Sequence, residues 1–246
     1  LKALPGANEK LITEAGKYAD RMSVNIELPS NESLKLLAPQ KSKDKILKPM
    51  STIKNNIIHY SDMKKTIKST PLFVPGGQST QLIVGATPES DFKIINLSQN
   101  LYDKFNLKRV YYSAYVPVIQ NNKFLPQISH PPMIREHRLY QADWLIRFYG
   151  FKADELLKNS NDNFDLNYDP KTQWALNNLN HFPIDVNKAS YEMLLRIPGV
   201  GVTSAKKILK IRRVHKLTFD DLKKLRIFLK RSKYFITCSG KYYGQV

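Results

Sequence analysis

Cysteine is almost absent from this sequence: Cys238 is the only one among 246 residues. A single cysteine excludes a disulfide framework within the chain and a metal cluster held by several of its own thiolates. His59 and His181 stand alone, without the spacing of a metal site. We therefore expect no metal ion to be held by this chain alone.

Long apolar runs and acidic residues are also scarce. No run approaches the roughly 20 apolar residues that cross a bilayer, and no charged-then-apolar leader opens the sequence. The 21 Asp and Glu residues are outnumbered by 39 Lys and Arg, which gives a formal net charge of +18. Such an excess favours a polyanionic partner, nucleic acid above all. With 42% hydrophobic residues to bury, we expect a globular, cytoplasmic protein that binds nucleic acid and no membrane.

The first 118 residues alternate short apolar runs with helical stretches, a pattern typical of a parallel sheet with crossover helices. The predicted strands are 22–28, 81–86 and 109–116, and the predicted helices are 8–19, 43–68 and 89–105. A long loop is expected over 119–132 and a further helix over 133–151. This order predicts an α/β fold that forms half or more of a barrel, or a doubly wound sheet.

The composition changes after His181, where 15 Lys and Arg residues face 4 Asp and Glu. Such local positive charge is typical of a module that binds nucleic acid. Pro170 is expected in the first turn of another helix, in the region before this module. The predicted organisation is an α/β domain over 1–150, a connecting region over 151–180 and a helical, DNA-binding domain over 181–246.

Within the basic module, the stretch DVNKASYEMLLRIPGVGVTSAKKILKIRR (185–213) predicts two short helices joined by a glycine turn. Asp185 or Asn187 is expected to cap the first helix. Gly199 permits a turn that a side chain would hinder, and Gly201 lets the backbone approach a ligand closely. Both glycines precede the second helix, where unpaired N–H groups and the helix dipole favour an anion such as a DNA phosphate.

The stretch LLRIPGVGVTSAKKIL (194–209) resembles the helix-hairpin-helix motif, with its pattern L-x-x-I-P-G-apolar-G-x-x-x-A-x-x-I. The resemblance implies contacts to phosphates without reading of base identity. LTFDDLKKL (217–225) resembles the second hairpin helix that often accompanies the motif. In the alternative interpretation, Gly-Val-Gly is only a tight interhelical turn or a protein-docking surface. The DNA-binding residues expected here are Gly199, Val200, Gly201, Thr203, Lys206 and Lys207.

Polar residues gather near the predicted strands of the first domain. Asn25 and Glu27 end one strand, whereas Thr87 and Glu89 follow another. Ligands of parallel α/β folds bind at the carboxyl ends of strands, so a small polar ligand is implied. In the alternative interpretation, Asn25 bonds a loop and Glu27 pairs with a lysine. Arg135 is open in the same way, because it could contact nucleic acid or a cofactor, or form a salt bridge.

Four segments, followed by the hairpin, resemble one family over nearly the whole chain: DRMSVNIELPS, GGQSTQLIVGATPESD, LKRVYYSAYVPV and REHRLYQADWLIRFYGF. The family is that of the DNA modification/repair radical S-adenosylmethionine (radical SAM) proteins, which are often associated with a uracil-DNA glycosylase-like partner. The resemblance implies a partial TIM-type barrel that binds S-adenosylmethionine beside a [4Fe-4S] cluster and cleaves it to a radical. IVGATPE resembles the family's I-x-G-x-x-E segment beside the adenine, with one extra residue before Glu89. The implied cofactor-binding residues are Asn25, Glu27, Gln78, Ser79, Gln81, Gly85 and Thr87.

The family's cluster motif, C-x-x-x-C-x-x-C, is missing, and Cys238 cannot replace it. We expect the chain to be the C-terminal portion of a longer protein with its cluster ligands upstream, because the opening residues resemble the end of a strand. The alternative is a truncated, inactive product. Two functions stay open: an enzyme that performs radical chemistry on nucleic acid, and a non-catalytic DNA-binding scaffold that recruits a repair enzyme. No catalytic residue is assigned.

Overall fold

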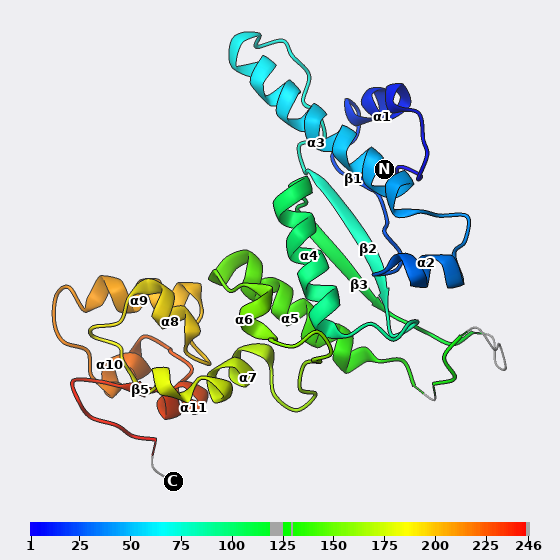
Figure 1. Ribbon diagram of the computed structural model, residues 1–246. Coiled ribbons are helices and arrows are strands. Elements are labelled where there is room, and N and C mark those ends of the chain that lie inside the picture. Colours follow the sequence, from blue (N-terminus) through cyan, green and yellow to red (C-terminus); the bar gives the residue numbers. More distant parts are fainter. Residues whose placement is uncertain (119–124, 129, 245–246) are drawn as a thin grey trace. The chain divides into compact units, whose positions relative to one another are not determined.

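The computed structural model describes residues 1–118, 125–128 and 130–244. They form two compact units, which we call unit 1 (1–140 with 158–163) and unit 2 (141–157 with 164–246). Helix α5 (Met133–Tyr149) begins in unit 1 and ends in unit 2 (Figure 1). The loop predicted over 119–132 lies partly outside the described residues.

Unit 1 is built on a parallel sheet of three strands in chain order: β1 (Met22–Ser23), β2 (Gln78–Val84) and β3 (Arg109–Ala114). β2 and β3 pair from Ser79 with Arg109 to Val84 with Ala114. The apolar side chains of this pair are buried, as is typical of a parallel sheet covered by helices. The predicted α/β character is thus confirmed, but the sheet is open, and no closed barrel exists in the described part of the chain.

β1 is shorter than the strand predicted over 22–28, and a side chain of β2 explains why. The Thr80 hydroxyl accepts a hydrogen bond from the Ile26 N–H (3.1 Å) and donates one to the Val24 carbonyl (2.7 Å). These bonds replace part of the backbone ladder. Pairing resumes at Glu27, which bridges Leu82 with a left-handed φ of 61°. The strand is therefore interrupted rather than absent beyond Ser23.

Three of the predicted helices of unit 1 are present: α1 (Glu9–Gly16), α3 (Lys43–Thr66) and α4 (Asp91–Phe105). Each begins after a polar N-cap whose side chain accepts a backbone N–H, namely Asn8, Ser42 and Ser90. α4 runs alongside β2 and β3 (Figure 1). A short helix that we did not predict, α2 (Asn31–Leu37), begins after the N-cap Ser30.

Unit 2 consists of short helices around a small parallel pair of strands, β4 (Ile184–Asp185) and β5 (Ile236–Thr237). Pro170 occupies the first turn of α7, as predicted, behind the N-cap Asp169. Trp174 is buried against Phe151, with ring centroids 5.5 Å apart. The remaining elements are α6 (Ala153–Leu156), α7 (Pro170–Asn177), η1 (Leu179–His181), α8 (Tyr191–Arg196), α9 (Val202–Ile211), α10 (Phe219–Lys224), α11 (Leu229–Ser232) and η2 (Lys233–Phe235).

Among the helices of the described residues, none combines the length and the apolar character that crossing a membrane requires.

Candidate nucleic-acid interface

Helices α8 and α9 form the predicted hairpin, but α8 begins later than we predicted. Its N-cap is Ser190, whose hydroxyl accepts the Met193 N–H at 3.2 Å. Asp185 and Asn187 do not cap it, because their side chains have other partners. Asp185 accepts the Asn187 N–H at 2.9 Å, and the Asn187 amide bonds both backbone groups of Leu217, at 2.8 and 3.0 Å.

Gly199 makes the turn between the two helices. Its φ of 83° lies in the left-handed region that favours glycine. A Cβ at this position would lie 2.9 Å from the Phe228 carbonyl oxygen and 3.4 Å from the Arg231 Cβ. The missing side chain therefore permits both the turn and the close packing of the turn on the segment that begins α11.

Gly201 is the N-cap of α9 and leaves the first turn of that helix without a side-chain cap. Its φ of −99° suits any residue, and a Cβ at this position would lie 3.2 Å from the Tyr149 hydroxyl. The first helical bond runs from the Ala205 N–H to the Gly201 carbonyl, at 2.8 Å. Within the described residues, the backbone N–H groups of Gly201 and of residues 202–204 have no acceptor. Such a row of free N–H groups at the positive end of a helix dipole is suited to an anion.

Polar and basic side chains are exposed on α9 itself. Thr203, Lys206 and Lys207 are exposed on α9, and the Lys207 Nζ also donates to the Leu225 carbonyl at 3.3 Å. No acidic residue lies on α9. The predicted hairpin residues Gly199, Val200, Gly201, Thr203, Lys206 and Lys207 thus all belong to one turn and the helix that follows it. Further exposed basic residues in this region are Lys210, Arg213, Lys216, Lys223, Lys224, Arg226, Lys230 and Arg231.

Two cations escaped the sequence analysis: Arg196, half-buried at the end of α8, and Lys171, buried against the hairpin. The Arg196 guanidinium lies 3.9 Å from the Phe151 ring centroid and pairs with Glu155 at 2.8 Å. Lys171 is only 8% exposed, and its Nζ donates to the Val200 carbonyl at 2.6 Å. Burial lowers the pKa of Lys171 to about 7. Nothing in the sequence distinguishes either residue from the many other basic ones.

The polar residues predicted near the strands of unit 1 do not all lie together. Gln78 and Ser79 are at the amino end of β2, and the Gln78 side-chain amide donates to the Met50 and Phe105 carbonyls, at 3.2 and 2.6 Å. Gln81 lies in mid-strand, while Gly85 and Thr87 follow its carboxyl end. The structure therefore does not bring Gln78 or Ser79 to the edge where ligands of parallel sheets bind.

Asn25 and Glu27 follow β1. Asn25 is buried. The Glu27 carboxylate forms ion pairs with Lys41, at 3.0 Å, and Lys2, at 3.8 Å. Glu27 thus has the lysine partner of the alternative interpretation, which leaves its predicted cofactor role without support from its contacts.

At the carboxyl end of β2, Glu89 is buried with one carboxylate oxygen engaged and the other free. Its Oε1 accepts hydrogen bonds from the Ser30 and Ser33 hydroxyls. Its Oε2 is buried without a partner among the described residues. Burial raises the pKa of Glu89, but the hydrogen bonds from Ser30 and Ser33 oppose it, so the net shift is downward and the carboxylate is charged at neutral pH.

Arg135 packs beside this cluster and is not free to contact nucleic acid. Its Nε pairs with the buried Asp91 carboxylate at 2.6 Å, and its Nη2 donates to the Glu89 carbonyl at 2.6 Å. The salt-bridge alternative for Arg135 is therefore the one that the structure shows.

No group of three or more His, Cys, Asp or Glu side chains in the described ranges is arranged to hold a metal ion. Cys238 is buried in unit 2, and burial raises the pKa of its thiol to about 12. A thiol of this kind is a poor source of the thiolate that metals bind.

Comparison with known families supports the hairpin directly. Residues 180–229 match the family model of the helix-hairpin-helix motif. No curated protein and no solved structure matches the chain. The matched range contains α8, α9 and α10, so unit 2 carries a helix-hairpin-helix motif, which indicates nucleic-acid binding. The predicted likeness to radical SAM proteins gains no support from these comparisons and stays a prediction.

Proposed function

We propose that unit 2 binds duplex DNA by its phosphate backbone, at the start of α9. The observation that carries the proposal is the row of free N–H groups from Gly201 to residue 204, which no side-chain cap occupies. One phosphate would accept from these groups, and the hydroxyl of Thr203 and the ammonium group of Lys206 lie on the same helix. Because every contact is to the backbone of the nucleic acid, binding is expected to show little sequence preference.

A bulky side chain at the hairpin tests this proposal. Gly201→Val should weaken binding of a labelled DNA duplex without changing its preference among sequences, since the valine side chain, whose Cβ would lie 3.2 Å from the Tyr149 hydroxyl, would crowd the start of α9. The backbone of Gly201 accepts a side chain, because its φ of −99° is ordinary. Binding is measured by fluorescence anisotropy at several salt concentrations, with RNA of the same sequence as a comparison. If the variant binds as the parent does, the hairpin is a turn or a protein-docking surface.

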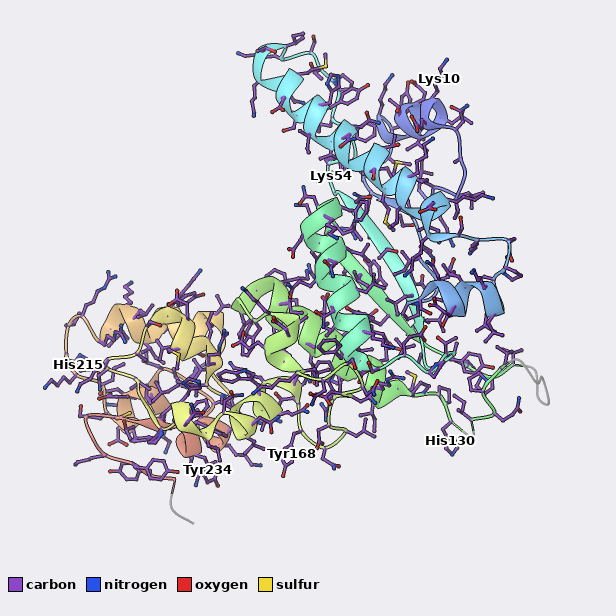
Figure 2. The ribbon with its side chains drawn as sticks, viewed as in Figure 1. Lys10, Lys54, His130, Tyr168, His215 and Tyr234 are labelled. Atoms are coloured by element: carbon purple, nitrogen blue, oxygen red, sulfur yellow. The ribbon has the colours of Figure 1, made fainter. Side chains whose placement is uncertain are left out.

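A matched pair of lysines separates phosphate contact from overall charge. Lys206→Met should reduce the slope of log affinity against log salt by about one, as expected for one lost phosphate contact. Lys10→Met removes the same charge from α1 in unit 1 (Figure 2) and should leave the slope unchanged. Equal slopes for the two variants would show that Lys206 is not at the interface.

For unit 1, we propose the S-adenosylmethionine-binding part of a radical SAM enzyme that acts on DNA. Two observations support it: parallel strands that follow chain order, as in a TIM-type barrel, and the charged Glu89 carboxylate with a free Oε2 at the carboxyl end of β2. That oxygen suits an amino group of the cofactor, which Gly85 and Thr87 would adjoin. The cofactor supplies the radical chemistry when bound, whereas Glu89 would only bind and orient it.

The [4Fe-4S] cluster does not fit the residues of this chain. Its thiolate ligands are lacking, because Cys238 is the single cysteine of this sequence and burial raises the pKa of its thiol to about 12. The ligands would have to come from residues other than the 246 of this sequence. We therefore derive no step of a reaction through the cluster.

The second candidate is a non-catalytic DNA-binding scaffold that recruits a repair enzyme, for example a uracil-DNA glycosylase-like protein; the helix-hairpin-helix motif at residues 180–229 suits this function as well. Calorimetry with S-adenosylmethionine separates the two candidates. The radical SAM proposal expects binding that Glu89→Gln weakens about tenfold, which corresponds to roughly one charge-assisted hydrogen bond. The scaffold binds DNA but gives no heat with S-adenosylmethionine.

A further inference from the structure

Lys171 contacts the hairpin from the protein interior. It lies in the first turn of α7, and its Nζ is 2.6 Å from the Val200 carbonyl oxygen and 4.9 Å from the Tyr149 ring centroid. Fully buried lysines are rare unless they are paired with a carboxylate. Here the direct partner is a backbone carbonyl of the hairpin, so the lysine serves the hairpin rather than an ion pair.

This contact fixes the direction of the Gly201 N–H. The peptide between Val200 and Gly201 is trans, since the only cis peptide in the described chain is Phe182-Pro183. In a trans peptide the C=O and the N–H point in opposite directions. Because Lys171 holds the Val200 carbonyl towards the interior, the Gly201 N–H points outward, on the side of the free N–H groups that begin α9.

The charges around Lys171 leave its ammonium group without a carboxylate in contact. Asp169, just before α7, is the nearest source of negative charge and raises the pKa of Lys171, but its carboxylate accepts from Arg231 at 2.7 Å. Arg196 on α8 lowers the pKa of Lys171 and is itself paired with Glu155 on α6. From α5, the ring of Tyr149 packs against the ammonium group. The positive charge of Lys171 therefore lies directly behind the hairpin.

We propose that Lys171 is a positioning residue for phosphate binding: it orients the Val200–Gly201 peptide and places a buried positive charge behind the phosphate, so that nucleic acid binds more tightly when Lys171 is protonated. This inference rests on the proposed DNA-binding function of unit 2. It extends that function by making the affinity depend on pH through a residue that never touches the ligand.

The direction of the pH effect follows from the pKa of about 7 in the free protein. Below this pH the ammonium form prevails and attracts the phosphate, whereas above it the neutral amine keeps a hydrogen bond to Val200 but loses the charge. Affinity should therefore fall as pH rises from about 6 to about 8.5. We expect a change of about fivefold, the factor for one unit charge roughly 8 Å from a phosphate at an effective dielectric constant of about 40.

The test compares duplex-DNA affinity at these two pH values for three forms of the full chain, at constant ionic strength. Between about pH 6 and about pH 8.5, the affinity of the parent should fall about fivefold more than the affinity of Lys171→Met. Lys188→Met removes an exposed lysine of the same unit and should keep the pH dependence of the parent. The histidines are the same in all three forms, so any contribution from them cancels in the comparison.

A second measurement keeps the inference testable if Lys171→Met folds poorly. The amide signal of Gly201 in a ¹⁵N-labelled parent protein should titrate with a midpoint near the pKa of about 7, because its peptide shares the Val200 carbonyl. If the parent and Lys171→Met bind DNA with the same pH dependence, or if the Gly201 signal does not move with pH, the inference is overturned while the proposed DNA binding stands. Absence of DNA binding at both pH values refutes the proposed function, and the inference with it.

Discussion

A methyl group at Gly199 should destabilise unit 2 strongly, whereas the same change at Gly201 should not. In Gly199→Ala, the left-handed φ of 83° would cost about 1–2 kcal/mol for a residue with a Cβ. The Cβ would also lie 2.9 Å from the Phe228 carbonyl oxygen, and such overpacking typically costs about 1–3 kcal/mol. Together these terms predict a loss of about 2–5 kcal/mol in the free energy of unfolding.

Tryptophan fluorescence during urea denaturation measures this loss, because both tryptophans, Trp144 and Trp174, belong to unit 2. Gly201→Ala is the matched control. Its φ is ordinary, and its Cβ would meet only the movable Tyr149 hydroxyl at 3.2 Å, so we expect a loss under about 1 kcal/mol. If Gly199→Ala and Gly201→Ala unfold at the same urea concentration, the assignment of Gly199 to a strained, closely packed turn is wrong.

Three further predictions concern single side chains of unit 2. Asn187→Ala removes the bonds to Leu217 at 2.8 and 3.0 Å and should lower the free energy of unfolding by about 2 kcal/mol in the same assay; no change would mean that the two segments hold together without Asn187. Cys238, whose pKa burial raises to about 12, should react with a thiol reagent far more slowly in the native than in the urea-unfolded protein, and equal rates would contradict its burial. The pKa of Lys171 falls from 10.5 to about 7 on folding. Between these two pH values the unfolded chain binds more protons than the folded protein, so the free energy of unfolding should rise with pH. Lys171→Met should lose this rise, and an equal slope of the free energy of unfolding against pH in both proteins would refute the burial of the ammonium group.

Local signals in the sequence were sufficient for the long helices and for the hairpin turn. α3 and α4 follow a serine N-cap and a long helical pattern, and IPGVG contains within five residues all that the turn needs. These features depend on neighbours in the chain, so a sequence reveals them. The short α2 has too few residues to show a helical period, and it was missed for that reason.

Features that depend on distant residues were not predictable. The contact of Lys171 with Val200 spans 29 residues, and that of Thr80 with Val24 spans 56. The predicted cap at Asn187 was wrong because its side chain is committed to Leu217, 30 residues away. β2 begins at Gln78 rather than at 81, and this earlier start places Gln78 at the amino end of the sheet.

The two turns of unit 2 differ in a way that explains why only the first is suited to phosphate. In the second turn, between α10 and α11, Arg226 takes the left-handed φ of 59° that Gly199 takes in the first. Phe228 is the N-cap there, in place of Gly201, and its bulky side chain stands at the start of a helix of only four residues. Its carbonyl oxygen accepts N–H groups of α11 and also occupies the space that Gly199 leaves by lacking a Cβ. The second turn therefore packs against the first, and the free N–H groups of α9 are left for the phosphate of the proposed function.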